Sequence, residues 1–182
     1  MVGALTTPSG TVGPAIRLRR QTEADYPVVI AVVDDWWGGR SLYRILPRLW
    51  FQHFTGTSWI AETEDDRLAG FLVGFVSPDD PSVAYIHMVA TNPNLRLRGL
   101  GRTMYEAFIA DVAGRGARTV RAITWPGNRT SVGFHRAMGF AIDDGPATQR
   151  LYGTPAYPGY DGEGEDRVVF SRAVRPDQRE SR

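Results

Sequence analysis

The chain of 182 residues contains no cysteine and no lysine. The lack of cysteine excludes disulfides, thiolate nucleophiles and zinc sites built on thiolates. All 21 cationic side chains are arginine, so Schiff-base chemistry and the lysine of a Walker-type phosphate loop are excluded as well. Only three histidines are present, and no paired spacing with carboxylates suggests a metal site, so we expect no metal.

The chain also lacks an excess of charge of either sign, and it lacks long apolar runs. The formal net charge is +1, which removes the long-range field of a dedicated nucleic-acid-binding protein. No stretch approaches the roughly 20 apolar residues that span a bilayer, and the sequence begins without a signal-peptide pattern. We therefore expect a soluble cytoplasmic protein that has neither nucleic acid nor a membrane as its partner.

Length and composition favour one domain with a substantial core, because apolar residues make up 42% of the chain. We expect that domain over residues 15–174. Residues 1–14 are rich in Thr, Gly and Pro, and residues 175–182 alternate charge around a proline. Both ends are therefore predicted to be flexible tails.

Hydrophobic periodicity predicts a mixed α/β order of elements. Strands are expected at 16–20, 58–62, 68–76, 83–90, 120–124 and 167–171, and helices at 22–37, 42–54, 100–114 and 128–138. Thr22 and Asp25 predict a capping box at the start of the first helix. Gly139 predicts the end of the last one.

The most informative segment lies between the strand at 83–90 and the helix at 100–114. Three arginines, Arg96, Arg98 and Arg102, surround Gly99 and Gly101 there. The first turn of a helix leaves N–H groups unpaired and adds the positive end of its dipole. Because glycine lacks a β-carbon, a pyrophosphate can approach this main chain closely. The alternative is an ordinary glycine turn with exposed arginines.

A second segment places a polar side chain at the mouth of a strand and then builds a short helix that closes on Gly-Phe. The two motifs read Arg96-x-x-Gly99-x-Gly101, then Asn128-x-x-Ser131-x-x-Phe134-His135-x-x-x-Gly139-Phe140. In this order and on these elements, they resemble those of the GNAT superfamily of acyl-CoA-dependent N-acetyltransferases. The resemblance covers roughly residues 16–172.

The resemblance implies a single-domain GNAT fold, a mixed α/β sheet that splays at its centre and is flanked by helices. It also implies direct transfer of acetyl from acetyl-CoA to a primary amine in a ternary complex, without a metal. Carried over residue by residue, it assigns cofactor binding to Val89, Ala90, Thr91, Arg96, Leu97, Arg98, Gly99, Leu100, Gly101, Arg102 and Asn128. The strand end would pair with pantetheine, the loop would wrap the pyrophosphate, and Asn128 would hold the pantetheine arm or the strand end.

Two histidines are the candidate catalytic groups. His135 occupies a position that is commonly the tyrosine general acid in that family, and an imidazole can still protonate the CoA thiolate. His87, six residues before Pro93, shares a strand face with Tyr85 and Val89 and can accept the proton of the amine. The alternatives are a histidine that fills space beside CoA and a buried histidine bonded across strands.

The acceptor itself is not determined by the sequence. The aromatic residues of 36–51 are typical of core packing, and the acidic loop at 157–166 is either a lid that attracts an amine or a solvated connection. A catalytically inactive CoA-binding regulatory module of the same fold is the main alternative function. A phosphotransferase is disfavoured by the absence of lysine. Monomer and homodimer both remain open.

Overall fold

The computed structural model describes residues 15–95 and 99–174, and the chain divides into two compact units. The first unit consists of Met1–Phe75 and Met88–Asp111, and the second of Val76–His87 and Val112–Arg182. The predicted tails at 1–14 and 175–182 lie outside the described residues. The expectation of one domain over 15–174 stays a prediction.

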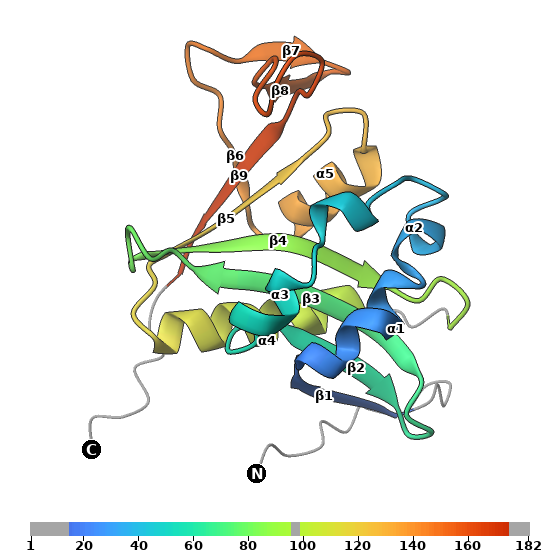
Figure 1. Ribbon diagram of the computed structural model, residues 1–182. Helices are drawn as coiled ribbons and strands as arrows, with labels where there is room; N and C mark the ends of the chain where they lie inside the picture. The colour runs from blue at the N-terminus through green and yellow to red at the C-terminus, as the bar shows by residue number, and fades with distance from the viewer. Residues whose placement is uncertain (1–14, 96–98, 175–182) are drawn as a thin grey trace, which may run out of the picture. The chain divides into compact units, whose positions relative to one another are not determined.

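Figure 1 shows how the helices and strands are arranged, and five short helices separate β1 from β2 along the chain. The strands are β1 Ile16–Arg20, β2 Trp59–Thr63, β3 Leu68–Val76, β4 Val83–Thr91, β5 Thr119–Thr124, β6 Ala141–Ile142, β7 Gln149–Leu151, β8 Thr154–Ala156 and β9 Val168–Ala173. The helices are η1 Glu23–Asp25, α1 Tyr26–Ile30, α2 Val33–Trp36, η2 Tyr43–Ile45, α3 Leu49–His53, α4 Leu100–Gly114 and α5 Arg129–Ala137.

The hydrogen-bonded strand order β1-β2-β3-β4-β5-β9-β6 makes a seven-stranded sheet, and β7 and β8 form a separate hairpin. Strands β4 and β5 run parallel, whereas β1–β2, β2–β3, β5–β9 and β6–β9 are antiparallel. The predicted mixed α/β class is therefore confirmed. Strands β6 to β8 were not predicted, because two or three residues are too short for periodicity to show.

The predicted continuous helix over 22–37 is wrong, although its start is correct. The Thr22 N–H donates to Asp25 Oδ2 at 2.7 Å, as the capping box requires. The helix then breaks at Val32, which has φ −118° and donates its N–H to Val29 O three residues back. The run of valines around this point explains the break, because β-branched side chains lower helix propensity.

The second predicted helix, over 42–54, is also divided. It consists of η2 and α3, and Leu46 between them has φ −125° and ψ 54°. Pro47 is the cause, because proline disfavours helical backbone in the residue that precedes it. Phe51 of this segment belongs to the first unit's core and Trp50 packs against it, as the sequence indicates.

Strand β3 carries the core of the first unit on both of its faces. Phe71 belongs to the buried cluster that also contains Val29 of α1 and Phe51 of α3. A Cβ at the neighbouring Gly70 would approach Leu100 and Met104 of α4 within 3.4 Å. Because adjacent strand residues point to opposite faces, α4 and the short helices cover opposite sides of β3.

Strand β5 is central to the second unit, since it pairs with β4 on one side and with β9 on the other. Its residues Val120, Ala122 and Thr124 are buried. Within the described residues, none of the helices has the length and apolar character needed to cross a bilayer.

Candidate functional site

Strand β4 presents one buried and one half-buried face. Ile86, Met88 and Ala90 are buried, whereas His87 and Val89 are half-buried in the alternation that the sequence predicts. Gly70 of β3 makes a close approach to this strand possible, because a Cβ there would lie 2.9 Å from Ala90 O. The main chain that is predicted to meet pantetheine is therefore held firmly against β3.

The chain leaving β4 is fixed by Asn92, which the sequence analysis did not single out. Its N–H donates to Ala69 O at 2.8 Å, and its side-chain amide donates to Leu68 O at 3.3 Å. Its side-chain oxygen accepts the N–H of Asn94 at 2.9 Å. This local bond is an Asx turn, so the Asn-Pro-Asn sequence is the signal that would have identified it.

Helix α4 begins immediately after Gly99, which has φ +86°. This left-handed conformation is accessible to glycine and unfavourable for other residues. A Cβ at Gly99 would meet no atom of the described residues within 4 Å, which leaves room among them for a ligand beside this main chain. The Thr103 N–H donates to Gly99 O at 2.9 Å, and the N–H groups ahead of it have no intrahelical acceptor. These features fit a bound pyrophosphate.

Arg96, Leu97 and Arg98 lie outside the described residues. The described part of the predicted loop ends in Arg102, whose Nη1 lies 3.6 Å from Glu106 Oε1 one turn along α4. Both side chains are more than half exposed, and ion pairs of this kind contribute little to stability. A guanidinium in this position is the kind of group that binds a phosphate.

In the second unit, Asn128 caps helix α5. Its side-chain oxygen accepts the Ser131 N–H at 3.1 Å, which satisfies one of the unpaired donors at the helix start. Gly139, with φ +78°, ends the same helix as predicted. The cap fixes the Asn128 side chain where β5 gives way to α5, and it occupies the amide oxygen rather than the amide N–H groups.

His135 is packed among aromatic rings of the second unit. Its ring lies parallel to that of Phe170, with centroids 4.3 Å apart, and edge-on to Phe140 at 5.3 Å. Its Nδ1 lies 2.8 Å from Ser131 O, and because a carbonyl only accepts, Nδ1 carries the proton. Burial lowers the pKa of His135, and the bond to Ser131 opposes this only in part. The imidazole is therefore neutral at pH 7.

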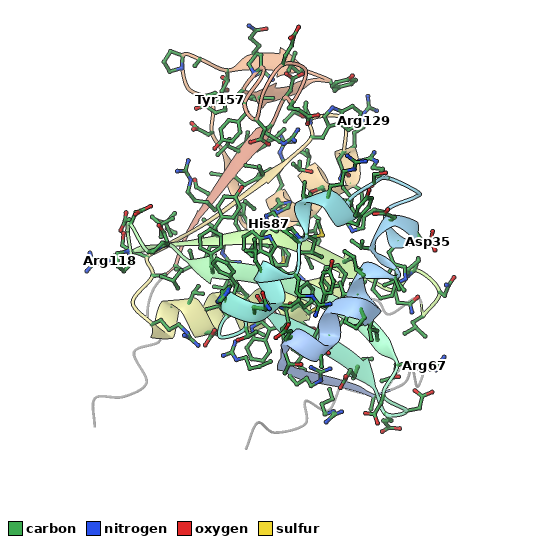
Figure 2. The ribbon with its side chains drawn as sticks, in the orientation of Figure 1. Asp35, Arg67, His87, Arg118, Arg129 and Tyr157 are labelled. Carbon is green, nitrogen blue, oxygen red and sulfur yellow. The ribbon has the colours of Figure 1, made fainter. Side chains whose placement is uncertain are left out.

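His87 is next along β4 after the last described pair of the β4–β5 ladder, Ile86 with Ala122 (Figure 2). Strand β5 continues to Thr124 and stays paired with Val168 of β9. Parallel strands end at the same edge of a sheet. His87 and the residues that follow Ala122 therefore emerge from the same end of this ladder.

The acidic loop at 157–166 is held by its own ion pairs. Arg167 contacts Asp161 and Glu165, each at 2.7 Å, and Asp166 accepts the Gly159 N–H at 2.9 Å. These contacts hold the loop in one conformation, but Arg167 offsets only one of its four negative charges, so both readings of the loop stay open.

Two tyrosines without a predicted catalytic role are associated with this loop, Tyr157 at its start and Tyr85 of β4. The Tyr157 hydroxyl donates to Asp143 Oδ2 at 2.6 Å, which raises the pKa of Tyr157. Burial raises the pKa of Tyr85, and Tyr160 and Asp161 raise it further. Both phenols are therefore neutral over the physiological range.

The aromatic segment 36–51 belongs mostly to the core, as expected. Phe51 is fully buried, and Trp36 stacks on Phe71 with centroids 6.3 Å apart. Tyr43 is the exception at 45% exposed. Among the residues that the structure describes, no group of three His, Asp or Glu side chains is arranged to hold a metal ion.

A family match, curated relatives and a solved structure all relate this chain to acetyltransferases. The L-2,4-diaminobutyric acid acetyltransferase of Streptomyces coelicolor is 30% identical over 125 residues, 67% of this chain and 71% of that protein. The Nocardia farcinica enzyme of the same name is 31% identical over 90 residues, 50% of this chain. The chain spans about half the length of that relative, 46%.

A solved structure, diaminobutyrate acetyltransferase EctA from Paenibacillus lautus in complex with L-2,4-diaminobutyric acid and coenzyme A, has the same fold. Its TM-score is 0.64 at 23% identity, over 89% of this chain and 96% of that one. Residues 21–140, more than half of the chain, match the family described as the Acetyltransferase (GNAT) family. On this match, together with the glycine-opened start of α4 and the capped start of α5, the chain belongs to the GNAT acetyltransferase family.

Proposed function

We propose that this protein transfers the acetyl group of acetyl-CoA to a primary amine, and that its acceptor is a small diamino acid of the kind represented by L-2,4-diaminobutyrate. The observation that carries the proposal is the open, glycine-led start of α4 within a chain of this family. The acceptor class is supported by the relatives named for diaminobutyrate and by the EctA complex.

Cofactor binding is assigned to the residues that the motifs predict. The main chain of Val89–Thr91 would pair with pantetheine, and the N–H groups from Gly99 to Arg102 would bind the pyrophosphate. Arg96 and Arg98 would add positive charge. Asn128, whose amide oxygen is engaged in the α5 cap, would donate an amide N–H to the pantetheine arm.

The chemistry needs no covalent enzyme intermediate. The neutral amine attacks the acetyl carbonyl, the C–S bond breaks, and the CoA thiolate leaves with a proton supplied to its sulfur. The amine loses one proton, for which His87 is the proposed base, directly or through water. The absence of cysteine is consistent with direct transfer in a ternary complex.

His135 is the proposed acid for the thiolate, and its surroundings make this role pH-dependent. Because burial lowers its pKa below the ordinary value of about 6.5, the protonated form is already the minor one at pH 6.5 and becomes scarcer as pH rises further. His135→Phe keeps a ring against Phe170 and is expected to lower kcat at least tenfold with little change in the Kd of acetyl-CoA. If the kcat of His135→Phe equals that of the wild type at every pH from 6 to 8, His135 has a packing role alone.

The direct test is CoA release from acetyl-CoA, followed with a thiol reagent. The chain has no thiol of its own, so the protein gives no background. The panel contains L-2,4-diaminobutyrate, ornithine, lysine, a polyamine and an alanine-terminated peptide. We expect the highest kcat/KM with the diamino acids. Binding of acetyl-CoA without release of CoA for any amine would support the non-catalytic module instead.

A further inference from the structure

Two exposed aromatic rings meet where strand β5 ends. Trp125 directly follows β5, and Tyr152 lies in the turn between β7 and β8, the hairpin that Figure 1 shows beyond the point of the β5 arrow. Their ring centroids are 5.2 Å apart with planes at 59°. Trp125 is 38% exposed and Tyr152 61%. We call these two rings the aromatic platform.

The backbone of Tyr152 is unfavourable for its side chain. Tyr152 has φ +51° and the next residue, Gly153, has φ +82°. A two-residue hairpin turn with both φ values positive is normally Asn-Gly or Gly-Gly. A tyrosine held in such a conformation costs stability, and residues retained in this way are concentrated at functional sites.

The position of Trp125 is shaped by a glycine two residues later. A Cβ at Gly127 would lie 2.1 Å from Cη2 of the Trp125 indole, far inside any real contact. The indole therefore lies over the Gly127 main chain, and this glycine is required for the ring to stay there. Gly127 does not have a positive φ, so its role here is space and not backbone freedom.

The aromatic platform lies at the end of the ladder from which His87 emerges. Trp125 follows Ala122, which forms the last β4–β5 pair with Ile86, by three residues. It also precedes Asn128, the proposed pantetheine contact, by three residues. The platform is thus placed on the same edge as the proposed base.

Aromatic faces, and indole above all, attract cations. The amine that attacks the thioester must be neutral and therefore cannot be the cation on the rings. A cation that stays there throughout the reaction must be a second amino group of the acceptor. We propose that Trp125 and Tyr152 bind a second, non-reacting ammonium group of the acceptor and thereby select diamines over monoamines. This inference rests on the proposed acetyltransferase function.

The test compares two acceptors that differ in one amino group, L-2,4-diaminobutyrate and 4-aminobutyrate. If another diamine from the panel is the better acceptor, it is paired with its counterpart that lacks the second amine. Trp125→Leu is expected to lower kcat/KM for the diamine about threefold to thirtyfold and to change that for the monoamine less than twofold. The KM for acetyl-CoA should stay constant.

Two further variants guard against misfolding. Gly127→Ala displaces the indole without removing it and should reproduce the loss of Trp125→Leu. Tyr152→Asn removes the ring and supplies the preferred turn residue, so it should lower diamine kcat/KM while Tm stays constant or rises. The matched control is Asp66→Gly, which relieves another left-handed residue, at φ +56°, and should leave both acceptors unaffected.

The outcomes separate the two proposals. Wild-type protein that releases no CoA with any amine would overturn the proposed function and this inference with it. If the wild type is active but the variants of the aromatic platform lower kcat/KM equally for the diamine and the monoamine, that result would overturn this inference alone. So would a raised KM for acetyl-CoA, which would indicate that the rings stack on the adenine of the cofactor.

Discussion

The proton on His135 Nδ1 is committed to Ser131 O at 2.8 Å, and the ring above Phe170 has little access to water. A tyrosine at this position would donate while neutral, whereas an imidazole must first be charged to act as a strong acid. Because this chain has histidine where the family commonly has tyrosine, the fraction of molecules able to act as the acid depends on pH. It also links the stability of the second unit to pH.

The stability of the protein is expected to fall as pH is lowered through the region below 6.5. The unfolded state binds a proton at about 6.5, while the folded pKa of His135 is lower. The stabilising contribution is thus fully present above about 6.5 and is lost as pH falls through the folded pKa. Tm measured between pH 5 and 7.5 should show this slope.

The slope should be absent from His135→Phe and retained in His53→Gln, which changes an exposed histidine of α3. Identical pH dependence of Tm in the wild type and His135→Phe would contradict the assignment.

At the scale of elements, Arg19 joins β1, η1 and β2 through two carboxylates. Its guanidinium contacts Asp25 Oδ1 and Glu62 Oε1, each at 2.6 Å. Burial acts to raise the pKa of Asp25, but hydrogen bonds from Arg19 and Thr22 outweigh it and lower the pKa overall. The network fixes the entry into the short helices that follow β1.

Arg19→Met is expected to cost about 1.5–3 kcal/mol of unfolding free energy at pH 7, because two largely buried carboxylates lose a charged donor. The stabilisation is present above the ordinary Asp pKa of about 3.9 and is lost as pH falls through the lower folded value. Urea unfolding should therefore show the full difference from the wild type at pH 7, and a difference that shrinks steadily as pH is lowered below about 3.9.

The control for this experiment is Arg17→Met, which removes a mostly exposed partner of Glu62 and should cost less than about 1 kcal/mol. A pH-independent difference for Arg19→Met would show that packing of its alkyl chain, and not charge, is what was lost.

The cap of α5 allows its structural and its cofactor roles to be separated. Asn128→Ala removes the bond to the Ser131 N–H and should cost about 0.5–2 kcal/mol of stability. Asn128→Asp keeps the capping oxygen and loses the amide donor, so stability should hold while the KM for acetyl-CoA rises several-fold. An unchanged KM in Asn128→Asp would limit this residue to capping.

For the whole molecule, binding of acetyl-CoA to the folded state alone should raise Tm. At a concentration 100 times Kd the stabilisation is about 2.7 kcal/mol, which corresponds to about 5–10 °C for a chain of this length. Thermal unfolding with and without acetyl-CoA measures this, with adenosine as the ligand control. No shift at saturating acetyl-CoA would remove the cofactor assignment.

Much of the arrangement follows from local sequence. The bounds of β3 and α4 and the capped, glycine-ended α5 were predictable, because their periodicity and terminal residues point the same way. The start of α4, where we propose that an anion binds, follows from Gly99, since the need for a left-handed residue is local. The two predicted long helices are divided because the valine run around Val32 and the proline at position 47 disfavour continuous helix.

The sequence by itself determined the family, the exclusion of thiol and lysine chemistry, and the residues that begin and end the main elements. Tertiary structure alone decided the charge state of His135, because its burial depends on packing against Phe170 of β9, a strand distant in sequence. It likewise decided that Trp125 and Tyr152 meet. The local sequence around each of these residues does not indicate which distant residue it will contact.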